Sequence, residues 1–289
     1  MAGVQTIYQK DIGFRPFLRW AGGKQGLVSQ LVSHLPPGFG QNGATYFEPF
    51  LGAGALFLAT LPARAVLSDL NSHLIHCFRA IRDNPGQMYR SCRTHEQKTC
   101  RSYYYEVREA FNARLNEQTV AQAARLLYLN RSCFNGIFRV NTDGEYNVPF
   151  GNKPRLLMPT LRDFRALSNA LSQVSLECRP YDAVLDWAKP GDFIYLDPPY
   201  PPLNGTSYFT HYTKERFSET DQRHVGHVAR ELTSRGCLVM ISNADTPAVR
   251  GLYSKWRYHV LPVRRYVSCK SQRQEVKETI ICNYGSGRV

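Results

Sequence analysis

The feature that most constrains the fold is a short apolar run that ends in a rigid polar turn. Residues 193–196 (Phe-Ile-Tyr-Leu) have the β-branched and aromatic content of a buried strand, and Asp197-Pro198-Pro199-Tyr200 follow at once. Open α/β sheets place ligand sites beyond the carboxyl ends of their strands. The sequence therefore predicts an α/β sheet with a ligand site at this turn. An ordinary strand-ending turn is the alternative, because Pro-Pro pairs also mark loops.

Each residue of this tetrad (residues 197–200) can help to hold a planar polar group. The two prolines lack backbone N–H groups, which leaves their carbonyl oxygens to face a ligand as acceptors. Asp197 adds a carboxylate, and Tyr200 adds a ring on which a flat group can stack. Acceptors beside a ring suit a planar group that carries an NH2, such as the exocyclic amine of adenine.

A second strand and a glycine turn indicate a cofactor site. Residues 45–50 read as a strand that runs into Leu51-Gly52-Ala53-Gly54-Ala55, and a helix follows. The next strand ends at Asp69, whose carboxylate can accept from ribose hydroxyls. Phe57 stands where dinucleotide-binding loops have a third glycine, which favours a nucleoside cofactor without a pyrophosphate. S-adenosylmethionine fits that description, and a purely structural turn is the alternative.

The segment 16–24 (Pro-Phe-Leu-Arg-Trp-Ala-Gly-Gly-Lys) reads as a second glycine loop that opens a helix. It lacks the Gly-x4-Gly-Lys-Ser/Thr pattern of a phosphate loop, so an NTPase is not indicated.

The charge distribution predicts a polyanionic partner. The formal net charge is +13. Residues 75–165 carry 15 Lys/Arg and 8 Asp/Glu, residues 250–289 carry 9 and 2, and residues 166–249 carry 7 and 10. A basic middle and tail around a slightly acidic centre fit an enzyme that grips phosphates around an uncharged reacting group.

The eight cysteines contain no Cys-x-x-Cys pair, so neither a metal site nor a redox pair is expected. The N-terminus lacks an apolar signal core, and no run approaches the roughly 18 apolar residues of a membrane span. A cytoplasmic protein with buried thiols and no membrane contact is the simplest interpretation.

Between residues 73 and 130 the pattern is helical, and an Asp-Gly hairpin signal at 143–144 follows between two alternating runs. Arg139 could form a bidentate pair with guanine, Asn135 or Asn141 could read adenine, and Phe134 could act as a wedge in the base stack. A surface hairpin with a solvated arginine is the alternative.

The rest of the chain predicts a helix over 160–171, a strand over 174–178, a polar-aromatic lid over 201–213 and a helix over 220–233. It also predicts strands over 238–243, 256–263 and 279–283, with a basic loop over 264–273 that suits phosphates.

In this order, the motifs resemble the Dam-type DNA adenine-N6 methyltransferases, the D12 class or alpha group. The resemblance covers roughly residues 15 to 284 and rests on the segments 16–24, 47–54, 68–71, 135–141, 146–151, 197–200 and 241–246. It implies a Rossmann-like S-adenosylmethionine-dependent methyltransferase sheet, formed by residues 1–74 and 166–289. A mainly helical target-recognition insertion that carries the hairpin would span residues 75–165.

The resemblance also implies roles for individual residues. The tetrad would hold a flipped adenine of duplex DNA while its N6 is methylated. The cofactor pocket would be lined by Trp20, Ala21, Gly22, Lys24, Glu48, Phe50, Gly52, Gly54, Asp69, Tyr181, Asp182 and Asp197. DNA contacts would come from Arg19, Arg131, Phe134, Asn135, Arg139, Asn141 and Pro149.

GATC is the expected site. The alternatives are a methyltransferase for RNA or a protein amide, and a catalytically silent DNA-binding protein. The sequence does not determine whether a cognate restriction endonuclease accompanies the chain.

Overall fold

The computed structural model describes residues 16–41, 43–152, 155–200, 217–266 and 275–285. The expected N-terminal arm, the lid over 201–213 and most of the basic loop over 264–273 lie outside the described residues. Among the helices that are described, none is long and apolar enough to cross a membrane.

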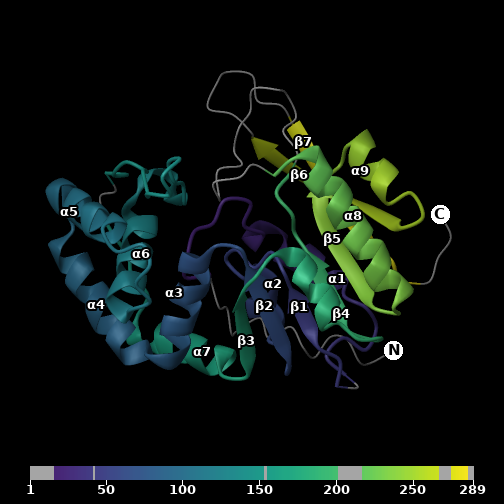
Figure 1. The fold of residues 1–289 in the computed structure, drawn as a ribbon, viewed down its shortest axis with the longest axis horizontal. Helices are drawn as coiled ribbons and strands as arrows, with labels where there is room; N and C mark the ends of the chain where they lie inside the picture. The colour runs from purple at the N-terminus through teal and green to yellow at the C-terminus, as the bar shows by residue number, and fades with distance from the viewer. Residues whose placement is uncertain (1–15, 42, 153–154, 201–216, 267–274, 286–289) are drawn as a thin grey trace.

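A seven-stranded sheet forms the centre of the molecule, in the order β3-β2-β1-β4-β5-β7-β6 (Figure 1). The first five strands pair in parallel, and β7 runs antiparallel to both of its neighbours. The strands are β1 (Tyr46–Glu48), β2 (Ala65–Asp69), β3 (Val174–Cys178), β4 (Phe193–Leu196), β5 (Leu238–Ala244), β6 (Arg257–Tyr266) and β7 (Glu275–Cys282). The predicted α/β sheet is therefore confirmed.

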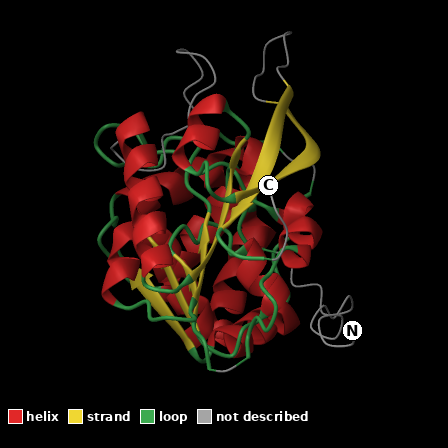
Figure 2. Ribbon diagram, turned by 90° about the vertical axis from the view of Figure 1, so that its right-hand side faces the viewer, coloured by secondary structure: helices red, strands yellow, loops and turns green. Residues whose placement is uncertain are grey.

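Alternate residues of the central strands point to two different cores, as the period of a strand requires. Val239 and Ile241 of β5 pack with α8 (Glu219–Ser234) and α9 (Pro247–Leu252), whereas Met240 faces the opposite core. The opposite core is covered by α1 (Val28–Ser33), α2 (Ala55–Thr60) and α3 (Ser72–Asp83). Figure 2 shows the sheet between these helical layers.

The strand order reverses between β1 and β4, which lie side by side with Tyr46 opposite Phe193. The chain passes from β1 to β2 and β3 on one side, and from β4 to β5 on the other. Open α/β sheets bind ligands at such a switch point, in the crevice beyond the carboxyl ends. Glu48 at the end of β1 and Asp197 just after β4 therefore meet where a ligand is expected.

Three helices stand to one side of the sheet: α4 (Pro85–Lys98), α5 (Arg101–Asn112) and α6 (Val120–Ser132) (Figure 1). A 3-10 turn (Phe134–Gly136) and two isolated bridges, Cys133 with Phe150 and Val140 with Tyr146, follow α6. The expected hairpin is thus a turn with single bridges, because its backbone bonds also go to neighbouring helices. Tyr146 N–H, for example, donates to Asn112 Oδ1 at 2.9 Å.

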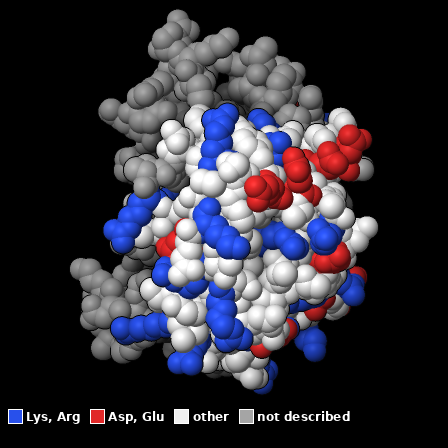
Figure 3. Space-filling view, turned by 90° about the vertical axis from the view of Figure 1, so that its left-hand side faces the viewer, with Lys and Arg blue, Asp and Glu red and all other residues white. Residues whose placement is uncertain are grey.

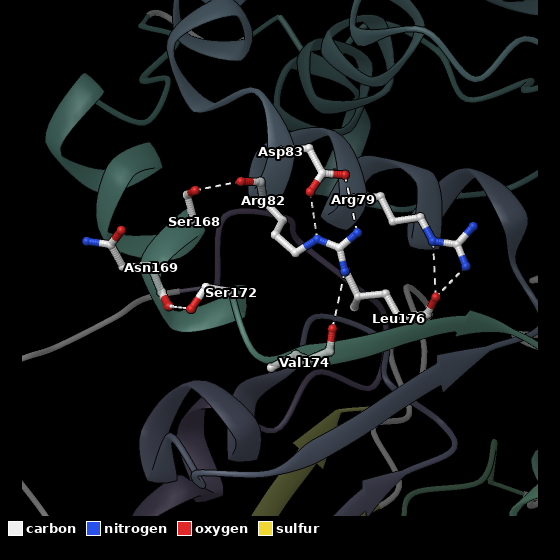
Figure 4. A network of polar contacts seen from close by, with 8 residues as sticks. All are labelled: Arg79, Arg82, Asp83, Ser168, Asn169, Ser172, Val174 and Leu176. Carbon is white, nitrogen blue, oxygen red and sulfur yellow. Dashed lines mark hydrogen bonds and ion pairs between the residues drawn. The ribbon is translucent and has the colours of Figure 1, made fainter.

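The predicted insertion bounds, residues 75 and 165, lie within α3 and within α7 (Leu161–Leu171). α3 packs against the edge strand β3 and against α7, and α7 leads directly into β3 (Figure 4). Arg79 Nε donates to Leu176 O at 3.0 Å, and Arg82 Nη1 donates to Val174 O at 3.2 Å. These two arginines therefore satisfy carbonyls of a sheet edge that would otherwise be open to pairing. Part of the positive charge of the middle segment serves the fold in this way.

Candidate active site

The carboxylate of Asp197 is held by two donors that reach the same oxygen. Lys24 Nζ lies 2.6 Å from Oδ1, and Ser242 Oγ donates to Oδ1 at 2.7 Å. The Tyr195 and Ser242 hydroxyls lie 2.8 Å apart and continue the chain of bonds into the core. Both donors converge on Oδ1, and within the described part of the chain no donor is bound to Oδ2. The Oδ2 atom can therefore accept from a substrate. The side chain of Asp197 is therefore fixed before any substrate arrives.

Lys24, which the resemblance places in the cofactor pocket, reaches the tetrad. Its side chain is only 4% exposed. The ammonium donates to Gly22 O at 2.9 Å and lies 4.8 Å from the ring centroid of Tyr200. A buried ammonium requires a charge partner, which Asp197 supplies, and an aromatic face adds to its stabilisation. The ion pair between Lys24 and Asp197 thus joins the glycine loop of residues 16–24 to the tetrad.

The second proline of the tetrad has a partner within the protein. Gln222 of α8 donates from Nε2 to Pro199 O at 2.5 Å, and Asn243 Nδ2 donates to Gln222 Oε1 at 3.2 Å. The sequence analysis expects both proline carbonyls to face a ligand, but this network takes up the carbonyl of Pro199. Pro198 is left as the proline whose carbonyl can serve a substrate.

Sequence reasoning gave no roles to Gln222, Ser242 and Asn243. One signal was present: Ser242 and Asn243 are polar residues inside an apolar strand run, and they are 1% and 0% exposed. Polar side chains in such a position need hydrogen-bond partners, which predicts a buried network beside the strand.

The glycine turn after β1 is stabilised by Asp69. Its Oδ2 accepts from Gly52 N–H at 3.0 Å, and its Oδ1 accepts from Asn71 N–H at 2.9 Å. Gly52 and Gly54 have φ angles of +47° and +66°, and a Cβ on Gly52 would lie 3.0 Å from Trp20 Cδ1. The two glycines therefore permit a backbone conformation, and Gly52 a close approach of Trp20, that other residues disfavour. Burial raises the pKa of the Asp69 carboxyl.

Glu48 lies at the switch point and is 2% exposed. Tyr46 donates from its hydroxyl to Glu48 Oε2 at 2.6 Å. Burial raises the pKa of Glu48 to about 8, and the neighbouring charge of Asp197 adds to the rise although the bond from Tyr46 opposes it. This carboxyl is therefore held protonated over much of the neutral range.

Two aromatic residues of the predicted cofactor set stack on each other. The rings of Phe50 and Tyr181 stack with centroids 4.9 Å apart and planes inclined by 22°. The hydroxyl of Tyr181 lies 2.9 Å from His224 Nδ1. Tyr181 and Asp182 open a 3-10 helix (Tyr181–Asp186) that begins three residues after the last residue of β3. Ala21, the remaining member of the set, occupies the turn that precedes Lys24 and is partly exposed.

Five of the seven predicted DNA-contacting residues fall on residues 134–149, here called the recognition segment, whereas Arg19 lies in the loop of residues 16–24 and Arg131 in α6. Phe134 is 50% exposed, and the neighbouring Asn135 is exposed with a φ of 55°. Arg139 donates from Nε to Asn147 Oδ1 at 2.8 Å and from Nη2 to Asn147 O at 3.4 Å. Among the described residues, none forms a bond to Nη1 of Arg139. This outer edge of the guanidinium can therefore meet a ligand.

Three other predicted DNA-reading residues have structural contacts. Asn141 accepts at Oδ1 from two N–H groups of its own turn, and its Nδ2 donates to Glu145 Oε2 at 3.0 Å. Pro149 is exposed, and its carbonyl accepts from Phe134 N–H at 2.9 Å. Arg131 is half-buried at the end of α6, and burial together with nearby Arg19 lowers its pKa.

Among the described residues, no group of three or more His, Cys, Asp or Glu side chains could hold a metal ion, and the cysteines form no disulfide.

The sheet order, the glycine turn at the switch point and the acceptor-rich tetrad together define an α/β methyltransferase of the S-adenosylmethionine-dependent fold class. The family model for D12 class N6 adenine-specific DNA methyltransferases matches residues 20–268, and the chain belongs to that family. The resemblance seen in the sequence is therefore confirmed.

Similar proteins agree with the family match. The chain is 35% identical to the Type II methyltransferase M1.LlaDCHI of Lactococcus lactis subsp. cremoris, over 98% of this chain and 100% of that protein. It is 34% identical to the DNA adenine methylase of Escherichia coli K12, over 95% and 97%. It is 32% identical to the Type II methyltransferase M.MjaIII of Methanocaldococcus jannaschii, over 93% and 99%. The chain is thus an adenine-specific DNA methyltransferase, and DNA is its substrate.

Proposed function

We propose that this enzyme transfers a methyl group from S-adenosylmethionine to N6 of an adenine that has been flipped out of duplex DNA, within the sequence GATC. The observation that carries the proposal is the arrangement at Asp197, where Lys24 and Ser242 both bind Oδ1. Oδ2 and the carbonyl of Pro198 would then accept from the target amine, and the ring of Tyr200 would stack on the base.

The residues beyond the tetrad fit a nucleoside cofactor. Gly52 brings bare backbone to the switch point, Glu48 and Asp69 end the neighbouring strands, and the Phe50–Tyr181 stack offers an aromatic surface for an adenine. S-adenosylmethionine would supply an activated methyl group on its sulfonium. Trp20, Ala21, Gly22, Gly54 and Asp182 complete the proposed pocket.

The chain's own contribution is alignment and electrostatic stabilisation. The lone pair of an adenine amine is delocalised into the ring, so the amine is a weak nucleophile. Two acceptors on its hydrogens favour a tetrahedral nitrogen whose lone pair points at the methyl group, and they stabilise the positive charge that develops. Because Asp197 is already fixed, little reorganisation is needed at the moment of transfer.

The recognition segment would face the DNA, within a target-recognition region that we assign to residues 75–165. Flipping an adenine costs a few kcal/mol, and Phe134 would offset this by filling the vacated stack. Arg139 would pair with guanine through its outer edge, while Arg19, Arg131, Asn135, Asn141 and Pro149 would contact neighbouring bases or phosphates.

Exposed basic residues of α4 and α5, among them Arg90, Arg93, Lys98 and Arg101, add positive charge around α6, the helix that leads into the recognition segment. Figure 3 shows Lys and Arg side chains spread over this side of the molecule, with most Asp and Glu side chains towards the right of the view. Such a field favours association with a polyanion and weakens as salt is added.

Transfer of labelled methyl from S-adenosylmethionine to unmethylated duplexes with and without GATC, followed by nucleoside analysis, tests the proposal. N6-methyladenine only in GATC-containing DNA is the expected result. Methylation at other sites would retain the chemistry and reject the sequence. No incorporation into either duplex would reject the proposed transfer from S-adenosylmethionine to an adenine of duplex DNA. A cognate restriction endonuclease is a separate proposal, which a search of the neighbouring genes would test.

A further inference from the structure

Asn130 lies where the glycine loop of residues 16–24 meets the recognition segment. Its side chain is 0% exposed. Oδ1 accepts from Arg19 N–H at 2.8 Å, and Nδ2 donates to Arg19 O at 2.7 Å and to Gly136 O at 3.3 Å. One amide group therefore binds both backbone polar groups of residue 19 and also the turn that carries Phe134.

Two further contacts join the same two segments. Gly136 has a φ of +65°, and a Cβ at this position would lie 2.5 Å from Arg19 Cδ, so the arginine packs directly on the bare turn. The ring of Trp20 stacks on Phe138, with centroids 5.4 Å apart and planes inclined by 21°. Because Trp20 also lies against Gly52, the loop touches the recognition segment on one side and the glycine turn on the other.

We propose that Asn130 is a positioning residue that sets the base-reading groups of Arg19 and Arg139 relative to the cofactor pocket, so that sequence discrimination depends on its amide. The inference rests on the proposed function. A buried amide that loses its partners is costly, so the loop and the recognition segment must keep a fixed relative position. Two sites that bias one shared element are energetically coupled, and the coupling is reciprocal.

Helix α6, which carries Asn130, also offers a closely matched control residue. Gln122 is 1% exposed, and its Nε2 donates to Phe111 O and Arg114 O, each at 2.9 Å. Its Oε1 accepts from Arg125 Nη1 at 3.1 Å. Asn130→Asp and Gln122→Glu therefore each keep one accepted bond and lose two donated bonds to carbonyl oxygens. Only the first of these changes touches both the loop and the recognition segment.

The experiment compares kcat and KM of the full-length enzyme and both variants on its preferred duplex and on duplexes with single base-pair changes. We expect Asn130→Asp to lower the discrimination ratio at the base pair that Arg19 contacts by about tenfold, within the range of one good base contact. The ratio should fall through a higher KM for the preferred duplex, with kcat changed by less than about threefold. The two variants should lower the melting temperature by similar amounts. Gln122→Glu should leave the discrimination ratio unchanged.

Equal discrimination by the two variants would overturn the proposal, because Asn130 would then serve stability alone. If the buried acid prevents folding, Asn130→Ser decides the matter, since it is uncharged and cannot span both segments. Failure of the proposed function would appear separately, as an unmodified enzyme that methylates no duplex. Hydrogen exchange would then carry the test. If amide hydrogens of both 16–24 and 134–139 exchange faster in Asn130→Asp but not in Gln122→Glu, the positioning role of Asn130 is supported. Unchanged exchange refutes that role.

Discussion

The tetrad and the recognition segment are both proposed to touch DNA, but they are built in opposite ways. Asp197 follows a buried parallel strand, and its partners come from the glycine loop and from β5. The recognition segment has single bridges and a 3-10 turn in place of regular strands. Its proposed contact residues, Phe134 and Asn135, are exposed.

This difference follows from the two tasks. Chemistry requires groups that are already oriented when the substrate arrives, which a sheet end and a buried network provide. Reading a sequence requires side chains that extend beyond the protein surface into a groove or a base stack, and irregular turns can present them. We therefore expect substitutions at the tetrad to change turnover, and substitutions on the recognition segment to change discrimination.

The largest effect is expected for Asp197→Ala. The change removes an acceptor for the amine in the transition state, so turnover should fall by about 10³-fold. The affinity for duplex DNA should stay within about threefold of the unmodified enzyme. Single-turnover methylation and fluorescence anisotropy with a labelled duplex measure the two quantities. A variant with near-normal turnover would remove Asp197 from the mechanism.

The same substitution should also destabilise the fold, because Lys24 is 4% exposed and would lose its carboxylate. Breaking such a pair costs about 3 kcal/mol. The double variant Asp197→Ala, Lys24→Met should recover much of that stability and none of the turnover. Recovery of turnover in the double variant would mean that the lost activity reflected misfolding.

The next effect separates two phenylalanines of one segment. Phe138 is 4% exposed, and its replacement by Ala should cost about 3–5 kcal/mol of unfolding free energy. Phe134 is 50% exposed, so Phe134→Ala should change stability by less than about 0.5 kcal/mol. Urea denaturation measures both. Equal costs would show that Phe134 packs in the core and cannot serve as a wedge.

Phe134→Ala should nevertheless slow methylation, since the vacated stack is no longer filled. A target adenine placed opposite a mismatched base needs less energy to leave the duplex, so the mismatch should restore the rate of this variant. A defect that is equally large on matched and mismatched duplexes would exclude the wedge role.

Local sequence patterns were sufficient for the sheet and for the position of the tetrad. The apolar run before Asp197 and the glycines after β1 predicted the strand ends, because strand period and turn chemistry are local properties. The partners of Asp197 were not predictable in this way. Ser242 is 45 positions from Asp197, and Asn130 is 111 positions from Arg19. Only the folded topology brings such residues together.

The recognition segment shows a second limit of sequence reasoning. Asp143-Gly144 correctly indicated a turn, but the pattern did not show that Asn141 would be engaged by that turn. Nor did it separate Phe134, which is exposed, from Phe138, which is buried. Short polar side chains compete for local backbone bonds, and aromatic residues can pack inward or outward from an irregular turn. Tertiary packing decides both outcomes.

A moderate effect is expected for Arg139→Ala, which should cost about 1–3 kcal/mol of discrimination at one base pair. Arg139→Lys should recover little, because an ammonium cannot form the two parallel bonds of a guanidinium. The ratio of kcat/KM on the preferred duplex to that on each single-pair variant measures the loss. Equal weakening on all sequences, with a shallower salt dependence, would make Arg139 a phosphate contact instead.

The last effect concerns pH and distinguishes the two regions by burial. Burial raises the pKa of Glu48 from 4.5 to about 8. Between those values the folded protein keeps a proton that the unfolded chain releases, so stability falls as the pH rises through this window. Between pH 5.5 and 7 we expect the free energy of unfolding to fall by about 1 kcal/mol per pH unit.

Glu48→Gln should remove this slope, because glutamine does not titrate and can still accept from the Tyr46 hydroxyl. The variant should match the unmodified enzyme near pH 4.5 and exceed it in stability at pH 8, as measured by urea denaturation across that range. Glu145→Gln is the control from the recognition segment, where the carboxylate is exposed and bonded to Asn141. It should leave the slope unchanged. A slope that persists in Glu48→Gln would place the titrating group elsewhere, and the buried carboxyl at the switch point would then be ionised in the folded enzyme.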